Sequence, residues 1–216
     1  MTQGATGFAA STERTTIDGP AGALEIVCNA PSSARRGIAL VAHPHPLQGG
    51  TLDNKVAQTL ARTFHSLDYV AVRFNFRGAG ASQGVHDEGV GETEDALAAL
   101  AWARSRYGDR LPVALAGFSF GSYVQTRVAG RIDAERLVLV GPAVMRFGGA
   151  TVPPDTIVVH GEEDEVVPLA AVLDWARPQA LPVVVFPGCS HFFHGRLTQL
   201  RDTVAGMWHR GHAPGA

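Results

Sequence analysis

The sequence predicts an α/β fold in which a mostly parallel central sheet is covered by helices on both faces. Two observations lead to this prediction. Short runs of apolar and β-branched residues recur along the chain, and they are almost continuously apolar, which is typical of strands buried on both faces. Segments with helical periodicity lie between most of these runs. Strands and helices that alternate in this way form parallel βαβ units.

Each expected strand is bounded by glycine, proline or polar residues. In chain order, the expected strands are residues 24–28, 38–42, 69–76, 112–118, 137–140, 156–160 and 183–186. The segment 142–155 is rich in Gly and Pro and is too short for a helical lid. We therefore expect an α/β fold without a cap domain.

The clearest helix covers residues 92–108. Leu97, Leu100 and Ala101 share one face, acids occupy the first turn, arginines occupy the last, and Gly108 is a stop signal. The other expected helices are residues 53–66, 120–130, 169–177 and 196–209. Together they supply enough helices to cover both faces of the sheet.

Composition points to one domain with a small-molecule partner. The chain has 216 residues, 45% of them apolar, and we expect a single domain over residues 13–216 after a flexible tail over residues 1–12. The formal net charge of −2 gives no basic field, so we expect no nucleic-acid and no membrane partner. Two cysteines are too few for a disulfide scaffold, and no segment resembles a signal sequence. We expect a cytoplasmic location and leave a homodimer open.

The pentapeptide GFSFG, residues 117–121, follows an expected strand and precedes an expected helix. This is the context of a nucleophile elbow, in which glycines on either side allow a sharp turn that exposes the serine hydroxyl. The helix that begins near Phe120 directs its positive end toward a developing oxyanion. Such a pentapeptide also occurs in ordinary turns, but its position after a buried strand favours Ser119 as a nucleophile.

A serine nucleophile needs a histidine base and an acid that orients it, and after this kind of elbow the chain order is serine, acid, histidine. Four acids, residues 162–165, follow one expected strand, and His191 and His194 follow the next. Carboxyl ends of parallel strands meet at one sheet edge, so these groups should lie near Ser119. We select Asp164 as the acid. We select His191 as the base, because His194 is placed to begin the last helix.

The oxyanion hole should combine the N–H of Phe120 with an N–H from the loop HPHPLQGG, residues 43–50. Prolines cannot donate, which leaves His45 or Leu47, and we prefer His45. We expect an open apolar substrate pocket around this site. Its expected boundary is formed by Leu47, Phe118, Phe120, Val144, Phe192 and Phe193.

Five ordered motifs give the chain a family resemblance. They are His43-Pro44 with Gly49-Gly50 and Asn54-Lys55, RFNFRGAGAS at residues 73–82, GFSFG at 117–121, GEEDEV at 161–166 and SHFFH at 190–194. On these motifs the chain resembles the α/β-hydrolase superfamily, and within it the small lidless bacterial serine hydrolases. The resemblance extends from about residue 24 to about residue 209. It implies an esterase-like triad of Ser119, Asp164 and His191 that acts on a small acyl substrate without a cofactor.

The sequence leaves three other interpretations to consider. The glycine loop at residues 77–84 has G-x-G-x-x-x-G spacing and opens no helix, so it does not favour nucleotide binding. A metal-dependent hydrolase would require His43, His45 and His191 or the acids at 162–165 to converge, and the chain has no H-E-x-x-H or cysteine-pair motif. An inactive scaffold would bind a small ligand or protein partner. The favoured function is a serine hydrolase that cleaves a small carboxylic ester, although thioesterase, amidase or peptidase activity would use the same residues.

Overall fold

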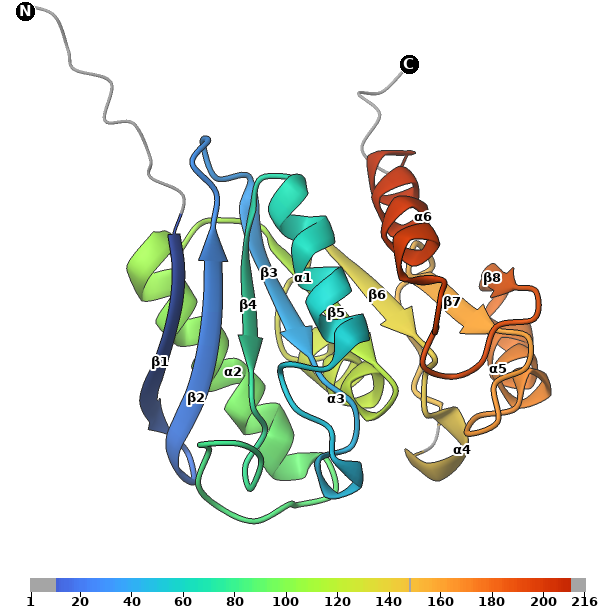
Figure 1. Cartoon of the computed structure of the whole chain (residues 1–216), viewed down its shortest axis with the longest axis horizontal. Coiled ribbons are helices and arrows are strands. Elements are labelled where there is room, and N and C mark those ends of the chain that lie inside the picture. The colour runs from blue at the N-terminus through green and yellow to red at the C-terminus, as the bar shows by residue number, and fades with distance from the viewer. Residues whose placement is uncertain (1–10, 148, 211–216) are drawn as a thin grey trace, which may run out of the picture.

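The computed structural model describes residues 11–147 and 149–210. Its centre is an eight-stranded sheet with the order β1-β2-β4-β3-β5-β6-β7-β8 (Figure 1). The β1–β2 and β2–β4 pairs are antiparallel, and the other neighbouring strands are parallel. The predicted fold, a mostly parallel sheet with helices on both faces, is confirmed.

The bounds of the elements agree with most of the expected ranges. The strands are β1 (Ser11–Gly19), β2 (Gly22–Ala30), β3 (Gly37–Ala42), β4 (Tyr69–Phe74), β5 (Val113–Phe118), β6 (Arg136–Val140), β7 (Ile157–Gly161) and β8 (Val183–Phe186). The α-helices are α1 (Lys55–Ser66), α2 (Val90–Tyr107), α3 (Phe120–Ala129), α4 (Val144–Phe147), α5 (Leu169–Ala176) and α6 (Leu197–Arg210), and two short 3₁₀ turns are η1 (Pro46–Gln48) and η2 (Arg177–Gln179).

Helices cover both faces of the sheet (Figure 1). On one face α1 and α6 pack together, and the buried rings of Phe64, Tyr69 and Trp208 meet edge to face there. On the other face α2 and α3 bury Leu100 and Val124 in a second apolar cluster. Strand β5 lies between β3 and β6, and all six of its residues are buried. The residue that follows β5 is therefore attached to a buried strand inside the sheet.

Strand β1 was not predicted. Its sequence, STERTTIDG, has Ile17 as its one apolar residue, and its residues alternate between exposed and half-buried. A polar edge strand of this kind lacks the apolar run by which the other strands were recognised. The tail prediction for residues 1–12 was wrong at Ser11 and Thr12, which belong to β1, and residues 1–10 lie outside the described residues.

The segment 142–155, expected to be too short for a helical lid, contains the one-turn helix α4. No cap domain is inserted there, as the sequence predicted. Across residues 11–147 and 149–210, no helix combines the length and the apolar character needed to cross a membrane.

Candidate active site

Ser119 lies in the sharp turn between β5 and α3. Its backbone has φ 55° and ψ −117°, a conformation that costs an L-residue on the order of 1–3 kcal/mol. A Cβ atom on Gly117 would lie 2.3 Å from the carbonyl oxygen of Gly121, and a Cβ atom on Gly121 would lie 2.4 Å from that of Ala42. Neither glycine can carry a side chain here. The turn therefore has the strained geometry of a nucleophile elbow.

His191 and Asp164 meet at the carboxyl edge of the sheet. His191 lies on the loop after β8, and its Nδ1 is 2.7 Å from Oδ2 of Asp164, on the loop after β7. Both side chains are almost completely buried, whereas His194 and the acids at 162, 163 and 165 are exposed. A carboxylate only accepts, so the proton of the neutral ring is on Nδ1 and Nε2 is left as a base. The catalytic roles of these residues stay predictions.

Asp164 is held in its ionised form. Burial acts to raise its pKa, but hydrogen bonds from His191 and from the Val167 N–H, together with attraction to His191 and His160, bring the pKa below its ordinary value. Oδ1 accepts the N–H groups of Val166 and Val167 at 2.9 and 2.7 Å. The backbone of the turn therefore fixes one carboxylate oxygen and leaves the other for the imidazole.

His160 is a neighbour of the pair that the sequence analysis missed. It lies in β7 and is fully buried, with Nε2 2.8 Å from the Val167 carbonyl oxygen and 3.4 Å from Oδ2 of Asp164. Burial lowers the pKa of His160, so the ring is neutral and its Nε2–H donates to the carbonyl. His160 thus fixes the 164–167 turn through the carbonyl oxygen of Val167. The available signal was a polar residue at the end of the apolar run TIVVH.

The loop between β3 and α1 borders the elbow. The Leu47 N–H donates to Nδ1 of His45 at 3.3 Å, and the N–H groups of Gln48 and Gly50 donate to the His45 carbonyl oxygen at 3.0 Å each. The His45 ring packs against Phe120 with centroids 4.9 Å apart. Because Leu47 is already engaged, the His45 N–H is the candidate that remains beside Phe120. Both oxyanion assignments stay predictions.

A cavity of about 230 Å³ lies beside Ser119. Helix α4 supplies three of its lining residues, and the turn after Asp164 supplies two more. Arg146 is the only arginine among the lining residues, which include no carboxylate. The lining consists of His45, Gln48, Ser119, Phe120, Ala143, Met145, Arg146, Phe147, Val166 and Val167. Sequence reasoning missed seven of these: it took only Val144 from the segment 142–155, no pocket residue from the acidic turn, and Leu47 in place of Gln48 from the 43–50 loop.

The predicted pocket was wrong at Phe193, and Leu47 does not line the cavity. Leu47 is 72% exposed and lies outside the cavity lining. Phe193 is fully buried, with its ring centroid 5.6 Å from that of Phe186, and it belongs to the apolar cluster beneath α6. A turn at Phe193, with φ 55°, directs this ring into the core while the adjacent phenylalanine faces outward. Spacing alone could not separate the two rings of SHFFH.

The other predicted pocket residues, Phe118, Val144 and Phe192, border the site without lining the cavity. The rings of Phe118 and Phe192 lie 4.9 and 5.1 Å from the imidazole of His191, so they flank the base. Val144 packs against the apolar cluster that contains Val172. Only Phe120, of the six residues expected to bound the pocket, is part of the lining.

His43 does not face the site in the way that the metal interpretation requires. Its Nε2 accepts the Phe76 N–H at 3.0 Å, and its Nδ1 contacts the Pro44 carbonyl oxygen at 2.6 Å. Burial lowers the pKa of His43 to about 4. Both ring nitrogens are therefore engaged by backbone groups. Among the described residues, no three His, Cys, Asp or Glu side chains gather in a metal-binding arrangement.

Comparison with known proteins places the chain in a family. Residues 23–145 match the family model of the X-Pro dipeptidyl-peptidases (S15 family), which is more than half of the chain. The chain belongs to this S15 family. A curated relative of this S15 chain, an uncharacterized protein from Rickettsia prowazekii, is 31% identical over 87% of this chain and 85% of its own length.

Two solved structures extend the assignment to α/β serine hydrolases without a lid. One, a lidless α/β serine hydrolase from Xanthomonas campestris, has 35% sequence identity, covers 96% of this chain and 99% of its own, and superposes with a TM-score of 0.88. The other, an α/β serine hydrolase homologue from Coxiella burnetii, has 41% sequence identity, covers 93% of this chain and 97% of its own, and superposes with a TM-score of 0.84. This S15-family chain is therefore a serine hydrolase of the α/β fold.

Proposed function

We propose that this serine hydrolase cleaves small carboxylic esters through an acyl-enzyme on Ser119. The observation that carries the proposal is the buried pair of His191 and Asp164, 2.7 Å apart, at the sheet edge where the strained Ser119 turn lies. A hydrolytic serine requires this combination of a base, a carboxylate that fixes its tautomer, and an exposed elbow.

In the proposed mechanism, His191 Nε2 takes the proton of Ser119 Oγ as the oxygen attacks the ester carbonyl. The N–H groups of Phe120 and His45 bind the oxyanion of the tetrahedral intermediate. Asp164 stabilises the imidazolium, which returns its proton to the leaving alcohol. A water molecule then attacks the acyl-enzyme by the same route and releases the acid.

The cavity supports a short acyl group. Its volume of about 230 Å³ lies below the roughly 300 Å³ at which pockets for drug-sized ligands begin. Most of its lining is apolar, from Phe120, Phe147 and Val167 among others. We therefore expect acetyl and butyryl esters to be cleaved faster than long-chain esters, with no activation at a lipid interface.

Peptidase activity is the second candidate, because the matching family model describes X-Pro dipeptidyl-peptidases. An enzyme that releases dipeptides from an amino terminus must hold an ammonium group, which calls for a carboxylate or several acceptors. The cavity lining offers Arg146 and no carboxylate. A cation at this position repels an ammonium group, so the charge of the cavity favours an ester over an amino-terminal peptide.

One experiment tests the chemistry and a second separates the two candidates. A fluorophosphonate probe should add once to the wild type and not to Ser119→Ala, as read by intact mass. Lack of an adduct on the folded wild type would contradict an activated Ser119. Initial rates with p-nitrophenyl butyrate and with Ala-Pro p-nitroanilide should then show ester cleavage only, whereas faster anilide cleavage would support the peptidase. A small acyl substrate and a cytoplasmic location are parts of the proposal that follow from the sequence, which leaves a homodimer open.

A further inference from the structure

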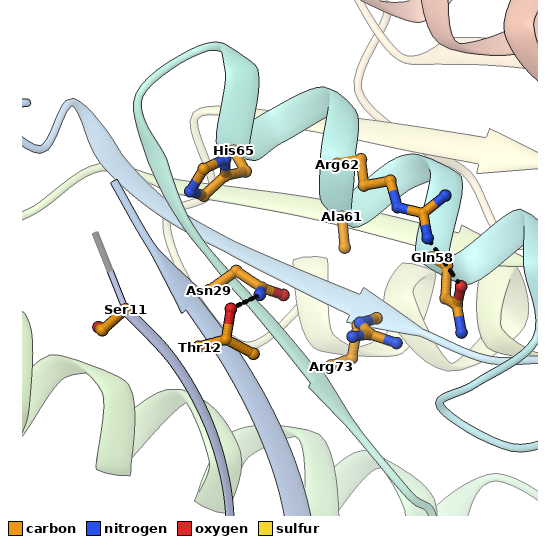
Figure 2. A pocket seen from close by; sticks show the side chains of 8 residues that line it. All are labelled: Ser11, Thr12, Asn29, Gln58, Ala61, Arg62, His65 and Arg73. Atoms are coloured by element: carbon orange, nitrogen blue, oxygen red, sulfur yellow. Dashed lines mark hydrogen bonds between the residues drawn. The ribbon is translucent and has the colours of Figure 1, made fainter. Parts of the chain in front are cut away.

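A second cavity lies on the α1 side of the sheet, between α1 and the strands β1, β2 and β4 (Figure 2). Its volume is about 410 Å³, and it shares no lining residue with the cavity beside Ser119. The lining consists of Ser11, Thr12, Asn29, Gln58, Ala61, Arg62, His65 and Arg73. The proposed hydrolysis uses none of these residues.

The lining of this second cavity is basic. Arg62, His65 and Arg73 lie around it, Ala61 is its one apolar residue, and the remaining lining residues are neutral hydrogen-bonding groups. The lining contains no carboxylate. Arg62 donates to the side chain of Gln58 at 3.2 Å, and no ion pair with an acid is formed by Arg62 within the described part of the chain. An anion that entered the cavity would meet the positive charge of the arginines among neutral polar groups, and no carboxylate of the lining.

Acids near the cavity neutralise its arginines only in part. Glu25 and Asp53 lie 2.5 and 2.7 Å from the guanidinium of Arg14, at the edge of this region. Asp53 reaches Arg73 at 3.4 Å and is shared between the two arginines. With Arg62, three guanidinium groups face two carboxylates. One positive charge is therefore left uncompensated.

Arg73 gives the cavity a buried cation that is incompletely hydrogen-bonded. The residue is 9% exposed, and one of its terminal nitrogens donates to the Leu52 carbonyl oxygen at 2.7 Å. Its Nε–H is buried and has no hydrogen-bond partner. A buried donor without an acceptor is destabilising, so the guanidinium of Arg73 keeps part of its hydrogen-bonding capacity unused among the described residues. Burial lowers the pKa of Arg73, yet a guanidinium stays charged at neutral pH.

Strand pairing fixes two of the neutral groups that line the cavity. The Asn29 side-chain amide donates to the Thr12 hydroxyl oxygen at 2.8 Å, which leaves the Thr12 hydroxyl proton for another acceptor. Asn29 and Thr12 face each other across the β1–β2 pair, so strand pairing fixes their positions (Figure 2). The hydroxyl group of Ser11 lies at the same end of the cavity.

We propose that this cavity binds the phosphate group of a small phosphorylated organic molecule. Planar guanidinium groups match the oxygen geometry of phosphate and bind it through two hydrogen bonds at once, which suits Arg62 and Arg73. The volume of about 410 Å³ exceeds what a bare anion fills and falls within the range of small-ligand sites. The polar lining from Thr12, Asn29 and Gln58 suits a hydroxylated body attached to the phosphate.

The test is calorimetric titration of the full chain with glycerol 3-phosphate, inorganic phosphate and glycerol, in phosphate-free buffer at constant ionic strength. Wild type should bind glycerol 3-phosphate at one site, more tightly than inorganic phosphate, and should not bind glycerol. Arg62→Gln should weaken this binding by about tenfold or more, because a charge-assisted, two-bond contact is lost. Arg131→Gln is the matched control: it removes the same charge at an exposed pair with Glu94 on the opposite face, and it should change binding by about twofold or less.

Absence of binding to wild type would overturn the proposal. Equal weakening by Arg62→Gln and Arg131→Gln would also overturn it, because that result would indicate diffuse charge attraction. Inorganic phosphate that binds as tightly as glycerol 3-phosphate would overturn the assignment of an organic ligand. Asn29→Ala tests the strand side of the cavity independently and should weaken binding several-fold. Thermal unfolding of each variant confirms that the protein tested is folded.

Discussion

Replacement of Asp164 by asparagine tests the proposed triad most directly. Oδ1 of Asp164 accepts two backbone N–H groups, from Val166 and Val167, and Oδ2 faces Nδ1 of His191 at 2.7 Å. An asparagine keeps the two backbone bonds only if its oxygen takes the Oδ1 position. Its NH₂ group then occupies the Oδ2 position and donates toward His191. The opposite rotamer would place the NH₂ group against two backbone donors.

The consequence for His191 is a change of tautomer. With a donor at Nδ1, the neutral imidazole carries its proton on Nε2, the nitrogen that must accept the proton of Ser119. Loss of the correct tautomer lowers kcat by about 10⁴ in serine hydrolases of this type. That factor corresponds to about 5.4 kcal/mol of transition-state stabilisation, since each tenfold step is worth about 1.36 kcal/mol. KM should change little, because Asp164 does not line the cavity.

The assay is the initial rate of p-nitrophenyl acetate hydrolysis at saturating substrate for wild type, Asp164→Asn and Glu163→Gln. Glu163 is the adjacent exposed acid, so its substitution removes the same charge and should alter kcat by about twofold or less. An Asp164→Asn enzyme within about tenfold of wild type would refute the tautomer argument. Equal losses in both variants would indicate a general charge effect.

Three further predictions concern the elbow, the base and the pH dependence of stability. Ser119→Ala and Ser119→Gly should both be inactive. Ser119→Gly should be more stable than Ser119→Ala by about 1 kcal/mol in the free energy of unfolding, because glycine accepts the φ of 55° without strain. Equal melting temperatures of the two variants would contradict backbone strain at this position. In Gly141→Ala the new Cβ would lie 3.2 Å from Cε1 of His191 and should displace the imidazole. We expect kcat to fall by about tenfold or more as a result. An unchanged kcat would show that the imidazole is not held in one position. Burial lowers the pKa of His43 from 6.5 to about 4, so the unfolded chain binds a proton in that window that the folded chain does not. The free energy of unfolding should therefore fall by up to roughly 3 kcal/mol as the pH decreases from about 6.5 to 4, measured by urea unfolding at several pH values, and a flat profile would contradict it.

The sheet was predictable because its strands bury apolar side chains on both faces. Seven runs of that type stand out from the sequence, and β8 (Val183–Phe186) was located without error. The edge strand β1 was not predictable by the same rule, since Thr15 and Thr16 interrupt any apolar pattern and only Ile17 packs toward the core. This strand is held by its pairing with β2. Such pairing involves two segments and cannot be recognised from the sequence of one.

The catalytic candidates were predictable because topology fixes where the strand ends lie. Ser119, Asp164 and His191 each follow a parallel strand, so they are held at one edge whatever the rest of the loop does. The local hydrogen bonds then decide which acid of residues 162–165 is buried. Asp164 is the buried acid among four because its carboxylate caps the N–H groups of the following turn, a role for which aspartate is well suited.

The pocket could not be predicted in the same way because side-chain direction within a loop depends on backbone dihedrals that spacing does not encode. Phe192 and Phe193 are adjacent and chemically identical, yet one flanks the base and the other lies in the core. Helix α4 places Arg146 in the cavity lining, and its single turn is too short for a periodic signal. In the proposed mechanism the parallel strands position the reacting groups, and we expect the α4 residues that line the cavity to influence which acyl group is accepted. Substitutions in α4 should consequently change the ratio of kcat/KM between substrates and leave the rate of fluorophosphonate labelling at Ser119 largely unaltered.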